Sequence, residues 1–420
     1  MKPVPWFVAC ALAGSTFAGM ALPAAAQTAT PMTPSASNAN ISLAQAVDAA
    51  WQRAVQAREA ESQTRRARGD QISANSLSAA APAFEVNHLN DRAHSNAGRR
   101  ETEVGIAWPL WLPGQRAARV AAADAELKFA DFGADAARLR VAGQVREAAW
   151  KLSSALAELQ AVDAQQRYLQ GLTDDVQRRV AAGDLARADS LAARADLLEA
   201  DAAKNDVAQR LQVLKLQWRV LTGLDAMPAM ALSMSADTNA VILLDEHPEI
   251  RLAVQAVERA RKRLDAIQLS RRDPPELSVK YREEAPGLGQ GTQRGIGVGL
   301  RIPFGTDGRN APLQAAAVGD LDVADANERR LRDQLDADLQ AARSAVASGM
   351  SQLEGARVRA TLLRERAQLV DTSFKAGETP LPELLRAANA ATQADGALVR
   401  QQAALGLAQA QLQQASGISP

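Results

Sequence analysis

The stretch VAAGDLARADSL at residues 180–191 decides the fold, because the chain carries a second version of it, FKAGETPLPELL, at residues 374–385. Each version has a glycine, Gly183 or Gly377, with an acid six residues later and a leucine two residues after the acid. The same offset of 194 residues relates the surrounding segments without a gap from residue 104 to residue 223. The sequence therefore indicates a tandem duplication, with a unit far longer than the repeats of solenoids and propellers.

The composition favours long helices. Hydrophobic residues make up 47% of the chain but aromatic residues only 4%, and alanine supplies much of the apolar surface. Such a sequence is typical of helices packed closely side by side rather than of a thick globular core. The 48 basic and 48 acidic side chains cancel, so the charge gives no electrostatic footprint for nucleic acid.

The first 26 residues have the three parts of a secretory signal peptide. Lys2 supplies the positive start, residues 8–22 the apolar stretch and Ala24–Ala26 the small residues of a cleavage site. A transmembrane anchor is the alternative, but the apolar run falls short of about 18–20 residues. Cys10, the only cysteine, would leave with the signal, so the mature chain is expected to have no disulfide, thiol or lipid anchor.

The remaining chain divides into a leader and two copies. Residues 27–40 are polar and rich in Pro and Ser, and we expect a flexible leader there. Repeat 1 is expected over residues 41–223, a connector over residues 224–246 and repeat 2 over residues 247–420. Each repeat should run through a helix, a β-hairpin, a very long helix, a tight turn and a returning helix.

The helices have clear start and stop signals. Ser42 and Gln45 form the pattern of a capping box, and the first helix should run from there to about residue 75. Residues 115–182 and 313–376 contain no proline and would each form a helix roughly 100 Å long. Apolar residues recur there at mixed three- and four-residue steps, which indicates coiled-coil-like packing. Returning helices are expected over about 186–221 and 382–414, and Pro248 suits the first turn of the helix that opens repeat 2.

Two segments, residues 82–111 and 274–304, change from helical to alternating character. A period of two on either side of a Gly- or Asn-rich turn predicts a β-hairpin, so each chain should supply four strands. The apolar residues that alternate along the strands are Phe84 and Val86, then Val104, Ile106, Trp108 and Leu110, and in copy two Leu277, Val279 and Tyr281, then Ile296, Val298, Leu300 and Ile302.

Four strands cannot close a barrel, and an open sheet in lipid leaves edge N–H and C=O groups without partners. Three protomers would supply twelve strands, an even number inside the observed range, and cyclic symmetry would gather the long helices into a hollow cylinder. We therefore expect a mainly α fold with a small β part, a tandem-repeat helical barrel and a shared twelve-stranded transmembrane β-barrel in a trimer. The alternative is a periplasmic coiled-coil structural or adaptor protein without a membrane barrel.

The signal peptide, the duplicated helix–hairpin–helix plan, the IPFG at residues 302–305 and the paired turns resemble outer membrane efflux proteins of the TolC family. The resemblance covers nearly all of the mature chain. It implies a homotrimeric channel-tunnel in the cell outer membrane, in contact with outer-membrane lipid, with a periplasmic helical tunnel. It also implies two partners, a periplasmic membrane-fusion adaptor and an inner-membrane transporter of the RND type. The compact strand regions favour the heavy-metal or cation efflux branch, although metal ions, drugs and polypeptides all remain open as cargo.

The resemblance assigns the two turns to the periplasmic tip. Three protomers would present six similar turns, a rim on which adaptor hairpins could sit, and the glycines can adopt the positive φ that such a reversal needs. The alternative is that these turns serve only to cap their helices. The docking residues expected on this basis are Gly183, Asp184, Leu185, Gly377, Glu378 and Thr379.

The resemblance also implies a pore constriction lined by carboxylates just inside the turns. Glu383 would form a ring that attracts cations, but Arg386 stands where the family often has a second acid and could simply pair with it. Asp189 matches a residue that in the family latches the closed tip to Tyr and Arg. The matching positions here are Phe374 and Thr379, which cannot form that salt bridge.

No feature of the sequence points to an enzyme. The three histidines, His88, His94 and His247, have no spacing typical of metal ligands, and no phosphate loop or nucleophile motif is present. We therefore expect no catalytic residue, metal or cofactor.

Overall fold

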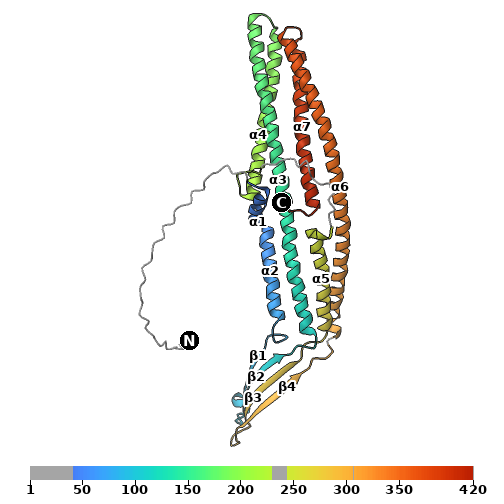
Figure 1. The fold of residues 1–420 in the computed structure, drawn as a ribbon. Coiled ribbons are helices and arrows are strands. Elements are labelled where there is room, and N and C mark those ends of the chain that lie inside the picture. The colour runs from blue at the N-terminus through green and yellow to red at the C-terminus, as the bar shows by residue number, and fades with distance from the viewer. Residues whose placement is uncertain (1–40, 229–243, 306, 420) are drawn as a thin grey trace, which may run out of the picture. The chain divides into compact units, whose positions relative to one another are not determined.

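The computed structural model describes residues 41–228, 244–305 and 307–419, which belong to one compact unit. The expected signal peptide, the leader and most of the connector lie outside the described residues. The fold is mainly α with one small sheet, as the sequence predicts (Figure 1). The elements in chain order are α1 (Leu43–Arg53), α2 (Val55–Ala74), β1 (Ala83–Asn90), β2 (Arg100–Pro109), α3 (Gln115–Ala182), α4 (Arg187–Thr222), α5 (Pro248–Leu269), β3 (Glu276–Ala285), β4 (Gln293–Arg301), α6 (Asp307–Lys375) and α7 (Leu381–Ala415).

The first helix begins as predicted but does not run unbroken. Ser42 Oγ accepts from the Gln45 N–H and Gln45 Oε1 accepts from the Ser42 N–H, so the capping box is confirmed. The expectation of one helix to residue 75 is wrong, because Ala54 is extended, with φ −65° and ψ 137°, and separates α1 from α2. The break lets α1 pack on both α3 and α4, while α2 follows α3.

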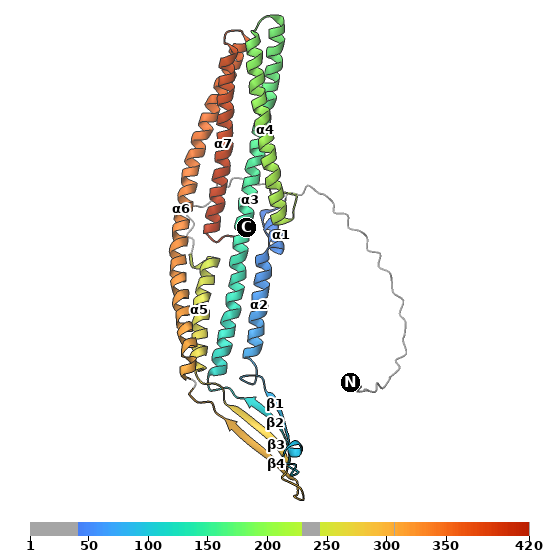
Figure 2. The ribbon, with the colours of Figure 1, turned by 180° about the vertical axis from the view of Figure 1, so that it is seen from behind.

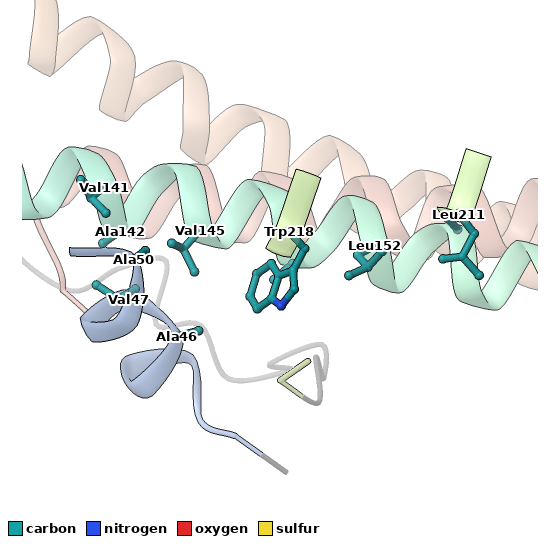
Figure 3. Close-up of a cluster of buried hydrophobic side chains, with 11 residues drawn as sticks. Ala46, Val47, Ala50, Val141, Ala142, Val145, Leu152, Leu211 and Trp218 are labelled. Carbon is teal, nitrogen blue, oxygen red and sulfur yellow. The ribbon is translucent and has the colours of Figure 1, made fainter. Parts of the chain in front are cut away.

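Helix α1 is held by an apolar cluster around Trp218, whose side chain is 2% exposed. Figure 3 shows the indole between the long helix α3 and the short α1. The Trp218 Nε1–H donates to the Ala226 carbonyl at 3.1 Å, so the ring is buried without an unpaired polar atom. The other buried members are Ala46, Val47, Ala50, Val141, Ala142, Val145, Ala149, Leu152, Ala155 and Leu211.

Both predicted hairpins are confirmed, and they join into one antiparallel sheet in the order β1-β2-β3-β4. Strand β2 of the first copy pairs with β3 of the second, for example Ile106 opposite Val279. Facing residues of antiparallel strands point to the same side of the sheet. Each row across the sheet therefore carries side chains of one face, contributed by both copies.

The two long helices differ at their starts. Helix α3 has the predicted bounds, and the αL residue Gly114 precedes it with φ 79°. Helix α6 begins at Asp307, six residues before the predicted start at Leu313. Proline within a helix removes one backbone hydrogen bond, so the sequence predicts a start after Pro312, but the helix continues through this residue.

The long helices pack as two pairs, α3 with α4 and α6 with α7, which also meet through α3 and α7. The turns between α3 and α4 and between α6 and α7 lie at the same end, opposite the sheet (Figures 1 and 2). Gly406 of α7 lies against Trp150 of α3, and a Cβ atom at position 406 would overlap the indole ring. The absence of a side chain there allows the two helices to approach each other.

Candidate functional site

The two helix turns have the same backbone design. Gly183 and Gly377 have φ of 88° and 81°, the left-handed conformation that favours glycine. The N–H of Asp184 donates to the Arg179 carbonyl at 2.9 Å, and the N–H of Glu378 donates to the Ser373 carbonyl at 3.0 Å. These bonds close the last turn of α3 and of α6 in the same way. The prediction of positive φ at both glycines is confirmed.

One apolar cluster holds both turns together within the protomer. Leu185 packs against it from the first turn, and Leu381 lies in it, 1% exposed, at the second. The cluster fixes the position of the two turns relative to each other. Its buried members are Leu169, Leu172, Val176, Ala193, Leu197, Ala200, Phe374, Leu381, Leu384 and Leu385.

The expected docking residues are mostly at the surface. Both glycines, Asp184 and Glu378 are exposed, while Leu185 and Thr379 are half-buried. Thr379 Oγ1 lies 2.6 Å from Ser373 Oγ, which also donates to Glu378 Oε2 at 3.4 Å. The second turn is thus stiffened by hydroxyl contacts, and the carboxylates of both turns remain open to a partner.

The matching acids Asp189 and Glu383 have different surroundings, and one of the causes is a proline in copy two. Asp189 Oδ2 accepts from the N–H of Ala186 at 3.1 Å and so caps α4. The position that matches Ala186 in copy two is Pro380, the N-cap of α7, and proline has no N–H to donate. The carboxylate of Glu383 is therefore free for other partners.

Glu383 is bound by two arginines. Arg366, on α6 across the turn, donates to Glu383 Oε1 at 2.9 Å, and Arg386 lies 3.4 Å from Oε2. The pairing with Arg386, the alternative to a free carboxylate, is thus present, and Arg366 is a partner that the sequence analysis missed. The carboxylate is 32% exposed and the arginines 57% and 74%. The three side chains carry a net charge of +1, whereas an isolated carboxylate would carry −1.

At Phe374, one of the two positions that match the tip latch of the family, the structure has a packed aromatic ring and no salt bridge. Phe374 is 3% exposed, and the guanidinium of Arg179 on α3 lies 5.0 Å from its ring centroid. This cation–π contact joins the two helix pairs near the turns. Arg179 and Phe374 lie in different copies, and no spacing rule in the sequence relates them.

Two further polar contacts join the helix pairs. Asn389 Nδ2 on α7 donates to Asp196 Oδ2 on α4 at 3.1 Å. On α3, burial raises the pKa of Tyr168 to about 12, and the nearby Asp371 carboxylate of α6 adds to this shift. Tyr168 and Asp371 also line an open cleft of about 340 Å³ between α3, α6 and α7. The helix pairs are therefore held at separate points with solvent-accessible space between them.

The sheet has one apolar face, and none of the described residues covers it. In its central row, Phe84, Ile106, Val279 and Val298 lie side by side across the four strands. Their exposed fractions run from 48% to 72%, which is unusual for a contiguous apolar patch on a soluble protein. The other large exposed members are Val86, Trp108, Leu277, Tyr281, Ile296 and Leu300.

The opposite face of the sheet is polar. Lys280 Nζ lies 3.1 Å from Glu103 and 3.4 Å from Glu85, so one lysine links three strands. Arg282 pairs with Glu101 at 2.8 Å. On β4 the middle of this face is made of Gly295, Gly297 and Gly299, which have no side chains. Over the middle of the sheet, one face is therefore apolar and the other polar.

The histidines occupy separate structural positions. His88 Nδ1 lies 3.0 Å from Thr102 Oγ1, and His247 Nδ1 accepts from the Glu249 N–H at the start of α5. Among the residues that the structure describes, no three His, Cys, Asp or Glu side chains are grouped so as to hold a metal ion. None of the helices in these same ranges has a stretch both long enough and apolar enough to cross a membrane.

The fold is similar to that of known outer-membrane channels. The Campylobacter jejuni CmeC outer membrane channel matches with a TM-score of 0.72 at 17% identity, over 89% of this chain and 85% of CmeC. The outer membrane protein VceC from Vibrio cholerae matches with a TM-score of 0.72 at 17% identity, over 90% and 96%. The open state of the Neisseria gonorrhoeae MtrE outer membrane channel matches with a TM-score of 0.72 at 17% identity, over 90% and 89%. The sequence itself matches no protein-family model and no curated protein.

Proposed function

We propose that the chain is an outer-membrane channel-tunnel, the passive exit duct of a tripartite efflux system. The observation that carries the proposal is the sheet, whose apolar face is open to solvent while its other face is polar and ion-paired. A strand with apolar residues outward and polar residues inward is the pattern of a membrane barrel. The similarity in fold to outer-membrane channels supports the same function.

The open edges of the sheet explain why the proposal requires a trimer. Among the described residues, β1 pairs only with β2 and β4 only with β3. Edge groups without partners are costly in lipid, so three protomers joined edge to edge would close a twelve-stranded barrel. Outer-membrane lipid would then contact the apolar face, and the long helices would enclose a periplasmic tunnel. A coiled-coil scaffold or adaptor without a barrel is not favoured, because it leaves the apolar face unexplained.

The end with the two turns is the docking end in this proposal. A periplasmic membrane-fusion adaptor would bind at Gly183, Asp184, Leu185, Gly377, Glu378 and Thr379. The adaptor would in turn bind an inner-membrane transporter of the RND type. The exposed backbone and the carboxylates of both turns support this placement. The transported substrates would be small solutes such as drugs or metal cations, without catalysis by the duct itself.

We place the pore constriction at Glu383, Asp189 and Arg386, just inside the turns. Because Arg366 and Arg386 both contact Glu383, their charges offset those of Glu383 and Asp189, and the constriction has no net negative charge. A ring without net charge lacks the attraction for cations that a ring of free carboxylates has. The proposed constriction would therefore select differently from a ring of free carboxylates.

The first test is the mass of the protein extracted from the outer-membrane fraction in mild detergent. Light scattering, corrected for bound detergent, should give a trimer, and the trimer should conduct ions in a planar bilayer. Recovery of a monomer or dimer from the soluble periplasm would refute the channel.

A matched pair of variants tests the assignment of the sheet faces. Val279→Arg places a charge on the apolar face, at a cost of about 2–4 kcal/mol near the middle of a bilayer. Ser278→Arg, one residue away, places the same charge on the polar face. The first should sharply reduce the trimer in the membrane fraction and the second should leave it unchanged. Equal yields of the two would contradict the assignment.

A further inference from the structure

An open groove of about 620 Å³ lies where the sheet meets the helices. It is lined by the connection from β2 to α3, by the end of α5 with the connection to β3, and by the first turns of α6. The groove is remote along the chain from the turns and is unused by the proposed exit path. It combines apolar with basic and amide side chains, chiefly Leu112, Ile267, Leu269, Arg271, Arg272 and Asn310.

The charge around the groove is positive. Arg271 and Arg272 line it and are exposed. The neighbouring acid, Asp273, is paired with Arg309 at 3.2 Å. The side-chain amide of Asn310 donates to the Arg271 carbonyl at 2.7 Å and fixes the loop against the start of α6.

The groove also borders the apolar face of the sheet. The alternating row of β4 runs on past the strand through Leu300, Ile302 and Phe304, which are 58%, 64% and 93% exposed. Leu269, which lines the groove, and Leu313, in the second turn of α6, are 48% and 59% exposed. In a membrane barrel, aromatic and basic residues at such a border lie at the level of the lipid headgroups.

We propose that this groove binds one anionic phospholipid per protomer. The phosphate would lie between the side chains of Arg271 and Arg272, and the acyl chains would follow Leu269, Ile302 and Phe304 onto the apolar face. Arginine suits this task because its planar guanidinium binds phosphate oxygens in pairs. The proposal rests on the proposed function, since it requires the sheet to be in a membrane.

The test uses the full-length trimer in mild detergent with equal amounts of phosphatidylglycerol and phosphatidylcholine of the same acyl chains. Native mass spectrometry should show phosphatidylglycerol retained over phosphatidylcholine by about thirtyfold, the factor that two arginines near an anionic lipid supply. The double variant Arg271→Gln/Arg272→Gln should bring the ratio close to one. Equal retention by the unchanged trimer, or a preference that survives in the double variant, would overturn the proposal.

The matched control is Arg329→Gln/Arg330→Gln, an exposed arginine pair about 28 Å beyond Asn310 along α6. It removes the same charge and should leave the thirtyfold preference unchanged. A loss of preference in the control as large as in the double variant would also overturn the site, because total charge would then explain the binding.

A labelling experiment distinguishes lipid from a neighbouring copy of the chain. Leu269→Cys, in a Cys10→Ser background, should react with a bulky maleimide in lipid-free detergent and be protected by phosphatidylglycerol only. A cysteine blocked without any lipid would mean that a second protomer fills the groove, which overturns the proposal. A conducting trimer without lipid preference would refute this site alone, whereas failure to form a membrane trimer would refute the proposed function.

Discussion

Replacing Gly406 with alanine tests how closely the two copies of the repeat pack. Gly406 lies on α7 against the indole of Trp150 on α3, and both are buried. A Cβ atom at this position would lie 2.6 Å from Trp150 Cε3 and closer still to Cζ3 and Cη2. Carbon atoms pack at about 3.5–4.0 Å, so α7 or the indole must move by about 1 Å.

The expected cost follows from two opposing effects. Overpacking a core by one methyl group costs about 1–3 kcal/mol, and the short distances place this site at the upper end of that range. Alanine is better than glycine in a helix by about 1 kcal/mol. The net destabilisation should therefore be about 1–2 kcal/mol per protomer. At about 2–4 °C per kcal/mol for larger chains, the apparent melting temperature should fall by roughly 2–8 °C.

The assay is the thermal unfolding of the detergent-solubilised trimer, followed by far-UV circular dichroism at one scan rate. Gly355→Ala is the matched control, because Gly355 is also within a helix and a Cβ atom there would meet nothing within 4 Å. The control should melt at the same temperature as the unchanged protein or slightly above it.

A double variant shows whether the indole is the cause. Trp150→Leu removes the ring atoms that the new Cβ would meet, so Gly406→Ala should cost less in that background than alone. If Gly406→Ala raises the melting temperature as Gly355→Ala does, or if the cost is the same with leucine at position 150, the packing argument is refuted.

Three further predictions follow from the turns and the caps. Arg386→Glu should shift the reversal potential of the channel toward cations and Glu383→Gln toward anions, since a unit charge about 10 Å from a passing ion contributes about 0.4 kcal/mol in water before screening. Gly377→Ala, at φ 81°, should destabilise the turn by about 1–2 kcal/mol, seen as faster hydrogen exchange of its amides, while Gly377→Asn should cost less. Burial lowers the pKa of His247, so the protein should lose stability as the pH falls below about 6.5. His247→Asn keeps the helix cap on Glu249 and should remove this pH dependence.

Each of these predictions has a result that contradicts it. Unchanged reversal potentials in both charge variants would mean that neither side chain lines the ion path. Equal exchange rates for the alanine and asparagine variants would mean that the positive φ is not the cause. A melting temperature of the unchanged protein that holds constant between pH ~7.5 and pH ~5.5, across the ordinary pKa of histidine, would mean that His247 is not kept neutral by its burial.

The sequence predicts this fold where local rules apply without competition. The bounds of α3 are correct because Gly114 and Gly183 end it on both sides and nothing interrupts it between them. The break at Ala54 could not be predicted, since alanine is the best helix former and the break comes from the packing of α1 on α3 and α4. The predicted start of α6 is wrong because a proline usually marks a helix boundary, whereas α6 continues through Pro312.

For the candidate site, the backbone turns could be predicted from the sequence, but most of the side-chain contacts could not. The duplicated glycines located both turns, and the spacing of Glu383 and Arg386 allowed their ion pair. The stronger partner, Arg366, is 17 residues before Glu383 on another helix, and only the folded hairpin of α6 and α7 brings the two together. The contact of Arg179 with Phe374 joins the two copies and likewise requires the fold.

Pro380, together with the two arginines of copy two that bind Glu383, makes the two turns chemically unequal. In a trimer the turns would alternate around the rim, one with its acid engaged in a helix cap and the next with its acid held between two arginines. The six binding positions would then be similar in shape, but three would have one charge environment and three would have another. An adaptor that occupies all six must either tolerate both kinds with a single surface or bind through two different contacts.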